Sequence, residues 1–313
     1  MVPSFILSWH RPTVLAALLV GSAIGLTAGP GGQNPQTFRS GVNLVQVPVV
    51  VTAKDGGLVR GLTPDDFRVT ENGVAQTLQF FSEGAPGDKL PLHIGLLLDV
   101  SESMGQDLSQ AATAAVRFVN ALDEAQDVTL VDFDEKVRVA RFGPDSYPRL
   151  FERIREKKAS GATALFDAVG MYLRGAADLE GQKVLLLYTD GGDTTSALNF
   201  GQLTKMLKLS DVLVYSIGYL SRDSRMAQPQ MQLTQIARDT GGDAFFPQDP
   251  RELNEIYAKI LDELGSRYTL GYVSSNAKED GSWRKVEVKV TRPDAAKAKV
   301  RTRPGYYAPG EVR

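Results

Sequence analysis

The 313-residue sequence contains no cysteine. This absence excludes disulfides, thiol catalysis, iron–sulfur clusters, cysteine zinc sites and a lipid-modified N-terminal cysteine. An excess of positive charge is also lacking, because 35 Lys and Arg residues stand against 37 Asp and Glu residues. Nucleic acid is therefore excluded as the main partner. What remains is the composition of an ordinary folded protein, with 42% hydrophobic and 23% charged residues.

The N-terminal region has too little continuous apolar sequence for a membrane-spanning helix. Its apolar run, Val14 to Leu26, has 13 residues, whereas a span needs about 20. Arg11 precedes the run and the small residues Thr27-Ala28-Gly29 follow it. A basic start, a short apolar stretch and a small-residue exit are typical of a secretory signal. We expect residues 1–28 to be a signal peptide and the protein to be exported, periplasmic or extracellular, with a membrane as partner only if the signal is uncleaved.

Two β-rich stretches flank a longer central region. Residues 29–41 are expected to be a flexible lead-in, since Gly, Pro and polar residues dominate them. Residues 42–90 and 266–308 show alternating strands, such as Arg284 to Thr291. Asn72-Gly73 is a strong hairpin signal between predicted strands at Phe67–Glu71 and Val74–Phe81. Neither stretch is large enough to cover its own apolar face. We expect both to pair into one small β-sandwich, with residues 91–265 inserted between them.

The central region alternates strands with helices. Ile94–Val100 is a continuous apolar run, as expected of a central parallel strand, and Leu108–Leu122 has one apolar face. Strand–helix alternation predicts an α/β fold with a doubly wound, mostly parallel sheet. Further strands are predicted at Val128–Phe133, Val184–Tyr188, Val212–Ile217 and Ala244–Phe246, and further helices at Arg149–Glu156, Ala164–Arg174, Phe200–Leu209, Met231–Asp239 and Arg251–Leu264.

Three polar clusters are predicted at one edge of this sheet, where ligands of such folds bind. Asp99, Ser101 and Ser103 follow one strand, Asp190 follows another, and Thr163 lies in a loop before a helix. Hydroxyl and carboxylate oxygens suit a hard divalent cation. Helix capping by Ser103, Asp107 and Thr163, and a simple turn at Asp190-Gly191, are the structural alternatives.

The Asp99-x-Ser101-x-Ser103 motif, Thr163 and Thr189-Asp190-Gly191 resemble the five-part metal site of von Willebrand factor A domains. The resemblance covers Pro91 to Gly265. It implies that Mg²⁺, or in some relatives Mn²⁺ or Ca²⁺, is held by Asp99, Ser101, Ser103, Thr163 and Asp190, with a Glu or Asp of a partner completing the shell. The flanks resemble a group of secreted bacterial relatives through Gly61-Leu62-Thr63-x-x-Asp66-Phe67 and Arg303-x-Gly305-Tyr306-Tyr307.

The resulting expectation is an exported adhesion module that binds a protein partner through an acidic residue and has neither an enzymatic activity nor a small-molecule substrate. The alternative is a scaffold of an envelope assembly in which the metal serves structure only. A Mg²⁺-dependent phosphatase or hydrolase is the third reading. Against it, Ser101 stands where phosphoaspartate phosphatases carry a second Asp, and neither His10 nor His93 is placed to act as a base.

Two further groups of residues are given structural interpretations. Asp132, Asp134 and Asp193 lie near the same rim of the sheet and are interpreted as solvated side chains. Trp283, Tyr306 and Tyr307 could form a partner surface, but capping of the sandwich core is the favoured role.

Overall fold

A computed structural model describes residues 44–84, 91–105, 107–122, 125–218, 227–249, 251–295 and 297–310. The predicted signal peptide and lead-in lie outside these residues. In the part of the chain that is described, no helix has both the length and the apolar character needed to cross a membrane.

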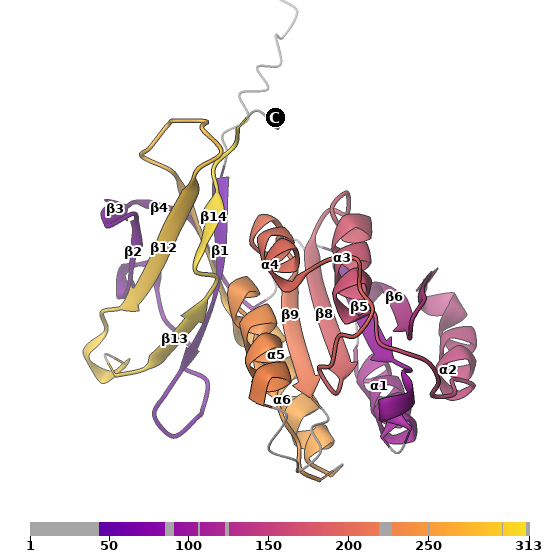
Figure 1. Cartoon of the computed structure of the whole chain (residues 1–313). Helices are drawn as coiled ribbons and strands as arrows, with labels where there is room; N and C mark the ends of the chain where they lie inside the picture. The colour runs from indigo at the N-terminus through magenta and orange to yellow at the C-terminus, as the bar shows by residue number, and fades with distance from the viewer. Residues whose placement is uncertain are drawn as a thin grey trace, which may run out of the picture. The chain divides into compact units, whose positions relative to one another are not determined.

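The chain forms one six-stranded sheet with helices and two four-stranded antiparallel sheets (Figure 1). The strands of the large sheet are β5 (Leu92–Asp99), β6 (Ala125–Phe133), β7 (Val137–Phe142), β8 (Gln182–Thr189), β9 (Leu213–Gly218) and β10 (Ala244–Phe245). Its helices are α1 (Leu108–Asn120), α2 (Tyr147–Arg155), α3 (Leu165–Ala176), α4 (Phe200–Leu209), α5 (Ala227–Thr240) and α6 (Glu252–Ser266).

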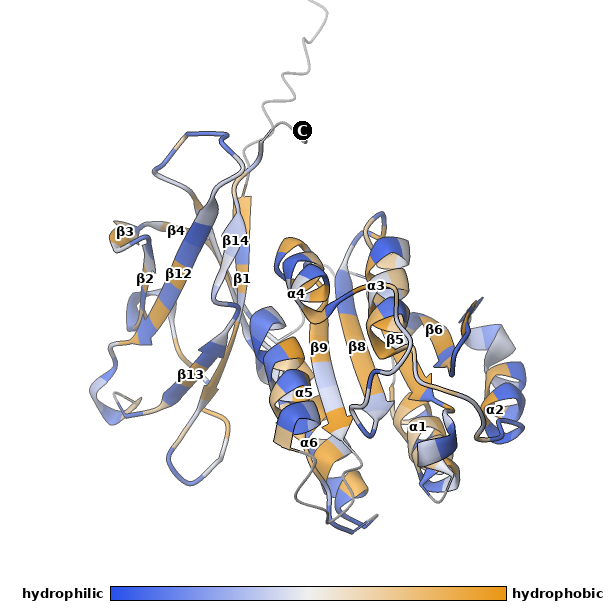
Figure 2. Ribbon diagram, in the orientation of Figure 1, coloured by the Kyte–Doolittle hydropathy of each residue, from blue (hydrophilic) through white to orange (hydrophobic). Residues whose placement is uncertain are grey.

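The six-stranded sheet is doubly wound, as predicted. Its strand order is β10-β9-β8-β5-β6-β7, with parallel pairing everywhere except between β6 and β7. Helices α1, α2 and α6 cover one face, and α3, α4 and α5 cover the other. Because both faces are covered, the middle parts of its central strands β5 and β8 are continuous apolar runs (Figure 2). Edge strand β7 was not predicted from the sequence.

One close contact fixes the packing of α3 on the central strand. Gly95 in β5 has no side chain, and the ring of Tyr172 from α3 occupies that space. A Cβ at position 95 would lie 2.3 Å from two ring carbons of Tyr172 and 2.7 Å from a methyl carbon of Leu185. Neither neighbour can move away, because both are buried in the core.

We therefore expect Gly95→Ala to lower the free energy of unfolding by about 1–3 kcal/mol, the usual cost of overpacking a core. Chemical denaturation monitored by circular dichroism measures the change. Gly175→Ala in α3 is the matched control, because nothing lies within 4 Å of the point that a Cβ would occupy there; it should leave stability unchanged or raise it by up to about 1 kcal/mol. Equal stability of the two variants would contradict this packing argument.

The two antiparallel sheets each combine strands from both ends of the chain. The N-terminal segment supplies β1 (Leu44–Thr52), β2 (Phe67–Glu71), β3 (Val74–Gln76) and β4 (Leu78–Glu83), and the C-terminal segment supplies β11 (Tyr268–Val273), β12 (Trp283–Val290), β13 (Lys299–Thr302) and β14 (Gly305–Tyr307). Their orders are β13-β1-β11-β4 and β14-β12-β2-β3. Side chains from both segments share one core, which confirms the predicted sandwich.

Local features of the sandwich agree with the sequence in one place and differ in another. Asn72 and Gly73 both have positive φ, 48° and 83°, as a two-residue hairpin requires. The single strand predicted over Val74–Phe81 is instead divided. Its first part, β3, pairs with β2, whereas β4 pairs with β11 in the other sheet.

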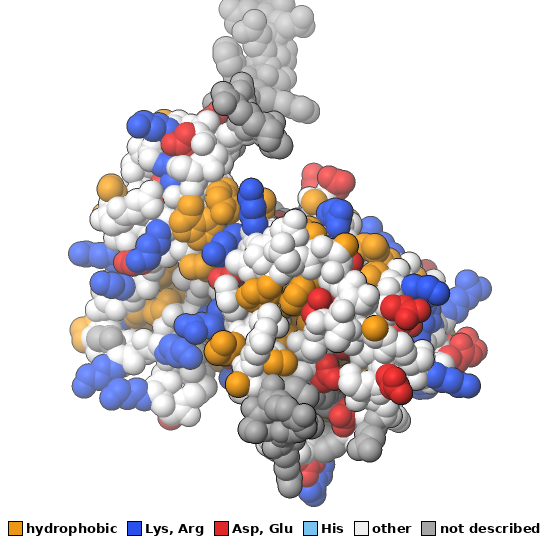
Figure 3. All heavy atoms as spheres, viewed as in Figure 1, with side chains coloured by type: hydrophobic (Ala, Val, Ile, Leu, Met, Phe, Trp, Pro, Cys, Tyr) orange, Lys and Arg blue, Asp and Glu red, His pale blue; other side chains and the backbone are white. Residues whose placement is uncertain are grey.

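The C-terminal tyrosines serve the sandwich. The buried carboxylate of Glu71 accepts hydrogen bonds from the hydroxyls of Tyr272 at 3.0 Å and Tyr306 at 2.8 Å. Trp283 and Tyr307 pack edge to face, with ring centroids 5.0 Å apart. Hydrophobic side chains reach the surface over β14, near α4 (Figure 3). These contacts support the capping role for Tyr306, which joins strands from both ends of the chain.

Candidate metal centre

The predicted site lies where the two central strands β5 and β8 end. The chain passes from β5 to β6 on one side and later returns to β8 on the other side of β5. Such a switch in strand order opens a crevice beyond the carboxyl ends of the strands. Asp99 is the last residue of β5, and Thr189 is the last residue of β8. The fold therefore brings together two clusters that are 90 residues apart in the sequence.

Asp99 is the centre of the hydrogen-bond network at this crevice. Its buried carboxylate accepts one bond from the backbone N–H of Ser101 at 2.9 Å and another from the hydroxyl of Thr189 at 2.6 Å. Burial, together with the nearby charge of Asp190, raises the pKa of Asp99 to about 6, against the lowering effect of these hydrogen bonds. When Asp99 is ionised, none of the described residues forms an ion pair that would compensate its charge.

The serine hydroxyls of the motif lie side by side. Ser101 Oγ and Ser103 Oγ are 3.2 Å apart, with Ser101 buried and Ser103 exposed. Neighbouring ligand oxygens of an octahedral Mg²⁺ lie about 3 Å apart, because each is 2.0–2.1 Å from the ion. The spacing of the two hydroxyls therefore fits a shared cation.

The loop before α3 is bonded to the loop after β5. The backbone N–H of Ser160 donates to Val100 O at 2.8 Å, and the N–H of Glu102 donates to Gly161 O at 3.1 Å. These bonds hold residues 160–163 against the serine motif. The third predicted cluster therefore lies at the same crevice.

Thr163 is also bonded to the segment that follows β8. Its N–H donates to the hydroxyl of Thr194 at 2.9 Å, and its carbonyl accepts the N–H of Thr194, also at 2.9 Å. The Thr163 side chain is buried, and within the described ranges its hydroxyl has no hydrogen-bond partner. That hydroxyl is available as a third neutral oxygen ligand.

Asp190 stands beside Asp99 on a tight turn. Its Oδ1 accepts the N–H of Gly192 at 3.1 Å, and Gly191 takes a positive φ of 82° that favours glycine. Burial raises the pKa of both Asp99 and Asp107, and the charge of Asp190 adds to the effect in each case. Two carboxylates this close favour a cation between or beside them.

The alternative reading of these residues as helix caps is not seen at α1 or α3. Asp107, at the cap position of α1, makes no side-chain capping bond, and the cap position of α3 is Ala164. Asp193, interpreted from the sequence as solvated, instead accepts the N–H of Phe166 at 3.1 Å. It also accepts the hydroxyl of Ser196 at 2.6 Å. Because Asp193 accepts the N–H of Phe166 near the start of α3, the Thr163 side chain does not cap that helix.

The donor set differs from that of a carboxylate or histidine centre. Across the described ranges, no group of three or more His, Asp and Glu side chains is placed to hold a metal ion. A cation at this crevice would depend on hydroxyls as much as on carboxylates. This is the donor chemistry that the sequence predicted, and it suits a hard cation such as Mg²⁺.

The chain matches a known protein family. The model of the von Willebrand factor type A domain matches residues 93–259. The chain belongs to the von Willebrand factor type A (VWA) domain family. An uncharacterized protein of Synechocystis sp. is 25% identical over 187 residues, which are 57% of this chain and 43% of that relative. The chain thus spans less than half of the relative's length.

Solved structures also resemble the chain, at low identity. The von Willebrand factor type A protein from Catenulispora acidiphila is 14% identical, with a TM-score of 0.45, over 86% of this chain and 74% of that one. The pilus adhesin SpaC from Lactobacillus rhamnosus GG is 9% identical, with a TM-score of 0.49, over 82% and 49%. BatB from Bacteroides thetaiotaomicron is 17% identical, with a TM-score of 0.45, over 56% and 100%.

His93 lies far from the crevice of the VWA domain. It is near the start of β5, six residues before Asp99, which corresponds to about 20 Å of extended strand. Its ring nitrogens are 2.9 Å from Asp127 Oδ2 and 2.9 Å from the carbonyl of Glu180. His93 therefore connects strands at the opposite edge and cannot act as a base for Ser101 or Ser103.

Asp132 corrects the sequence interpretation of the rim. Predicted to be solvated, its side chain is fully buried, and it bonds to Arg138, to Arg153 Nη2 at 3.1 Å and to Lys157 Nζ at 2.8 Å. Arg138 also forms a bidentate ion pair with Asp134, in which both N–O distances are 3.0 Å. This ion-pair cluster anchors the segment after α2, which leads into the loop of Thr163.

Proposed function

We propose that the VWA domain binds Mg²⁺ through Asp99, Ser101, Ser103, Thr163 and Asp190, and that this centre captures an acidic side chain of a protein partner. The observation that carries the proposal is the bonding of Asp99. Both of its carboxylate oxygens are held by the chain, one by Ser101 N–H and one by Thr189. The hydroxyls of Ser101 and Ser103 are left 3.2 Å apart at the same crevice.

These residues divide the work between charge and coordination. The hydroxyls of Ser101, Ser103 and Thr163 are neutral and would contact the cation directly. Asp99 and Asp190 would supply the negative charge and orient the hydroxyls and bound waters. When bound, the cation would provide positive charge that is largely uncompensated by its direct ligands, and an open position for a carboxylate from outside.

The same geometry supports a binding role over an enzymatic one. Ser101 stands two residues after Asp99, where phosphoaspartate phosphatases carry a second Asp. Among the described residues, the one histidine, His93, is bonded at the opposite edge of the sheet and cannot serve as a base. Export remains part of the proposal and rests on the residues around Arg11 and Val14–Leu26. The partner would accordingly be encountered in the periplasm or outside the cell.

Calorimetric titration of the purified protein with Mg²⁺ and Mn²⁺ tests the metal centre. We expect saturable binding of one ion per chain, and capture of a protein partner that is reversed by EDTA. Blocking the carboxylates of the partner with an amine should abolish capture. Partner assembly that survives EDTA would instead support a scaffold, and the absence of metal binding at millimolar concentration would contradict the proposal.

A third prediction concerns Thr163. Thr163→Val keeps the side-chain shape and the backbone bonds to Thr194 but removes the free hydroxyl. We expect the Mg²⁺ affinity to fall by about 10-fold, the lower part of the range for changes around a metal centre. Thr113→Val, on the exposed face of α1, is the matched control and should bind as the native protein does. Native affinity of Thr163→Val would remove Thr163 from the ligand set.

A further inference from the structure

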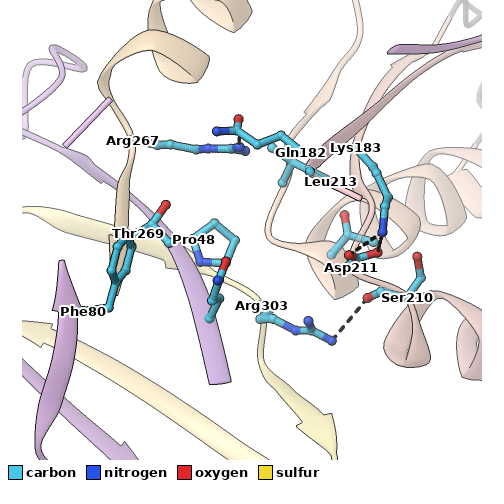
Figure 4. Close-up of a pocket in the computed structure, with 13 residues that line it drawn as sticks. Pro48, Phe80, Gln182, Lys183, Ser210, Asp211, Leu213, Arg267, Thr269 and Arg303 are labelled. Atoms are coloured by element: carbon cyan, nitrogen blue, oxygen red, sulfur yellow. Dashed lines mark hydrogen bonds and ion pairs between the residues drawn. The ribbon is translucent and has the colours of Figure 1, made fainter. Parts of the chain in front are cut away.

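A second cavity lies at the opposite end of the parallel strands, between the VWA sheet and the sandwich (Figure 4). Its volume is about 510 Å³. Gln182 and Lys183 at the start of β8, and Leu213 at the start of β9, form one side. Strands β1, β4 and β11 of the sandwich form the other side. The cavity shares no residue with the proposed metal centre.

The charges that line this cavity do not balance. Lys183, Arg267 and Arg303 supply three positive charges, and Asp211 supplies the single negative one. Lys183 Nζ is already paired with Asp211, at 2.6 and 2.9 Å from its two oxygens. The positive charges of Arg267 and Arg303 therefore have no negative partner in the lining of the cavity.

Arg267 is the clearest example of an unpaired charge in this cavity. It is 7% exposed, and its side chain extends from the end of α6 toward Gln182 (Figure 4). One terminal nitrogen donates to the side-chain oxygen of Gln182, while its buried Nε finds no hydrogen-bond partner among the described residues. Burial lowers its pKa, in keeping with a charge that lacks a counterion.

Arg303 is satisfied only by neutral groups. Its guanidinium donates to backbone carbonyls: Gly305 O at 2.8 Å, Lys208 O at 3.1 Å and Ser210 O at 3.3 Å. Over the ranges that the structure describes, no carboxylate forms an ion pair with Arg303 or Arg267. Buried charges are normally paired, because leaving one unpaired is costly. An anion from outside would provide the missing partner.

Part of the remaining wall is apolar. Pro48 from β1, Phe80 from β4 and Leu213 from β9 line the cavity. Figure 4 shows Pro48 and Phe80 on the sandwich side, facing the space below Arg267. A cavity of this size, with apolar walls and a few convergent polar groups, is typical of small-molecule sites. An inorganic anion alone would leave these walls without a contact.

We propose that this cavity binds a small organic carboxylate, with its charged group at Arg267 and its apolar part against Pro48, Phe80 and Leu213. A guanidinium matches the planar geometry of a carboxylate, and that of Arg267 lines the cavity and has a terminal nitrogen besides the one that donates to Gln182. The site is independent of the metal centre, since it lies at the amino ends of β8 and β9. Binding there does not require a divalent cation.

Calorimetric titration in the presence of EDTA tests the cavity separately from the metal centre. The probes are octanoate, neutral 1-octanol and inorganic phosphate, each titrated into the full chain. We expect saturable binding of octanoate, with 1-octanol and phosphate at least about 10-fold weaker, because each lacks one half of the recognition. No saturable octanoate binding, or equal binding of either comparison probe, would overturn the proposal.

Three variants locate the binding. Arg267→Met keeps the length and apolar stem but removes the charge, and should weaken octanoate binding by at least about 10-fold. Arg149→Met, an exposed arginine in α2, should bind octanoate as the native chain does. Thr269→Phe keeps every charge and fills the cavity, so it should abolish binding even if Arg267→Met fails to fold. Undiminished binding by Thr269→Phe would place octanoate elsewhere and refute the assignment.

Discussion

Asp99→Asn is expected to lower the Mg²⁺ affinity of the VWA domain by about 100-fold, the largest functional effect of any single change at the crevice. The substitution keeps the shape of the side chain but removes its negative charge. It also replaces one carboxylate oxygen with an amide N–H₂, which must face either the Thr189 hydroxyl or the Ser101 N–H. In the native protein both of these groups donate to Asp99. Ser101 N–H cannot accept and would lose its bond to an N–H₂, whereas the Thr189 hydroxyl can turn and accept from it, so one of the two native bonds is either lost or reversed.

Mg²⁺ titration of Asp99→Asn beside Asp178→Asn measures this effect. Asp178 is exposed beyond the end of α3, so its variant makes the same charge change away from the crevice and should bind Mg²⁺ normally. Circular dichroism of both variants in EDTA shows whether each is folded. A folded Asp99→Asn protein with native Mg²⁺ affinity would contradict the proposed role of Asp99, whatever partner the domain binds.

The convergence at the crevice was predictable because it follows from strand direction. Ile94–Val100 and Val184–Tyr188 are continuous apolar runs, which indicate buried parallel strands that end at the same edge. Asp99 and Thr189 indeed end β5 and β8. The roles of Thr194 and Asp193 were not predictable in this way. Both lie in an irregular segment, where position depends on tertiary contacts and has no sequence period.

Sheet membership was the part of the fold that local sequence could not predict. Val74–Phe81 has the pattern of one continuous strand, but β4 pairs with β11, almost 190 residues further along the chain. Edge strand β7 was missed for a related reason. Its residues are mostly half-buried or exposed, including Val139 at 47% exposure, so it lacks the apolar run that marks the central strands.

Burial of charged residues was equally hidden in the sequence. Asp132 lies one residue before the end of β6, close to the polar rim, a position that favours a solvated acid. Two of its three partners, Arg153 and Lys157, come from α2 and the segment after it. The cavity at Arg267 was not predicted either, because its cationic side chains, Lys183, Arg267 and Arg303, come from three separate parts of the chain. Such clusters become visible only once the fold has brought their members together.

Asp132→Ala is expected to cause a large loss of stability. It would leave Arg138, Arg153 and Lys157 around a site from which the fully buried carboxylate has been removed. Breaking a buried ion pair in this way costs about 3–5 kcal/mol. The side chains of Arg138 and Arg153 are each 34% exposed and can partly regain water, so we expect the lower end, about 3 kcal/mol.

The pH dependence of this loss distinguishes an ion-pair effect from simple loss of packing. Burial raises the pKa of Asp132, but the hydrogen bonds and charges of Lys157 and Arg138 outweigh it and bring the pKa below 3.8. An acid whose folded-state pKa is lowered stabilises the fold above its unfolded pKa and loses that contribution as pH falls through the folded value. The stability gap between native protein and Asp132→Ala should therefore stay constant from pH 7 to about pH 4 and shrink below it.

Urea denaturation at pH 7, 5 and 3 measures the gap. Asp145→Ala, an exposed acid just before α2, is the control and should change stability by less than about 0.5 kcal/mol at each pH. A gap below about 1 kcal/mol at pH 7 would show that the cluster is no stronger than a surface ion pair. A gap that is no smaller at pH 3 than at pH 7 would instead assign the loss to packing, because the ionic part should begin to fall once Asp132 takes up a proton in the unfolded chain.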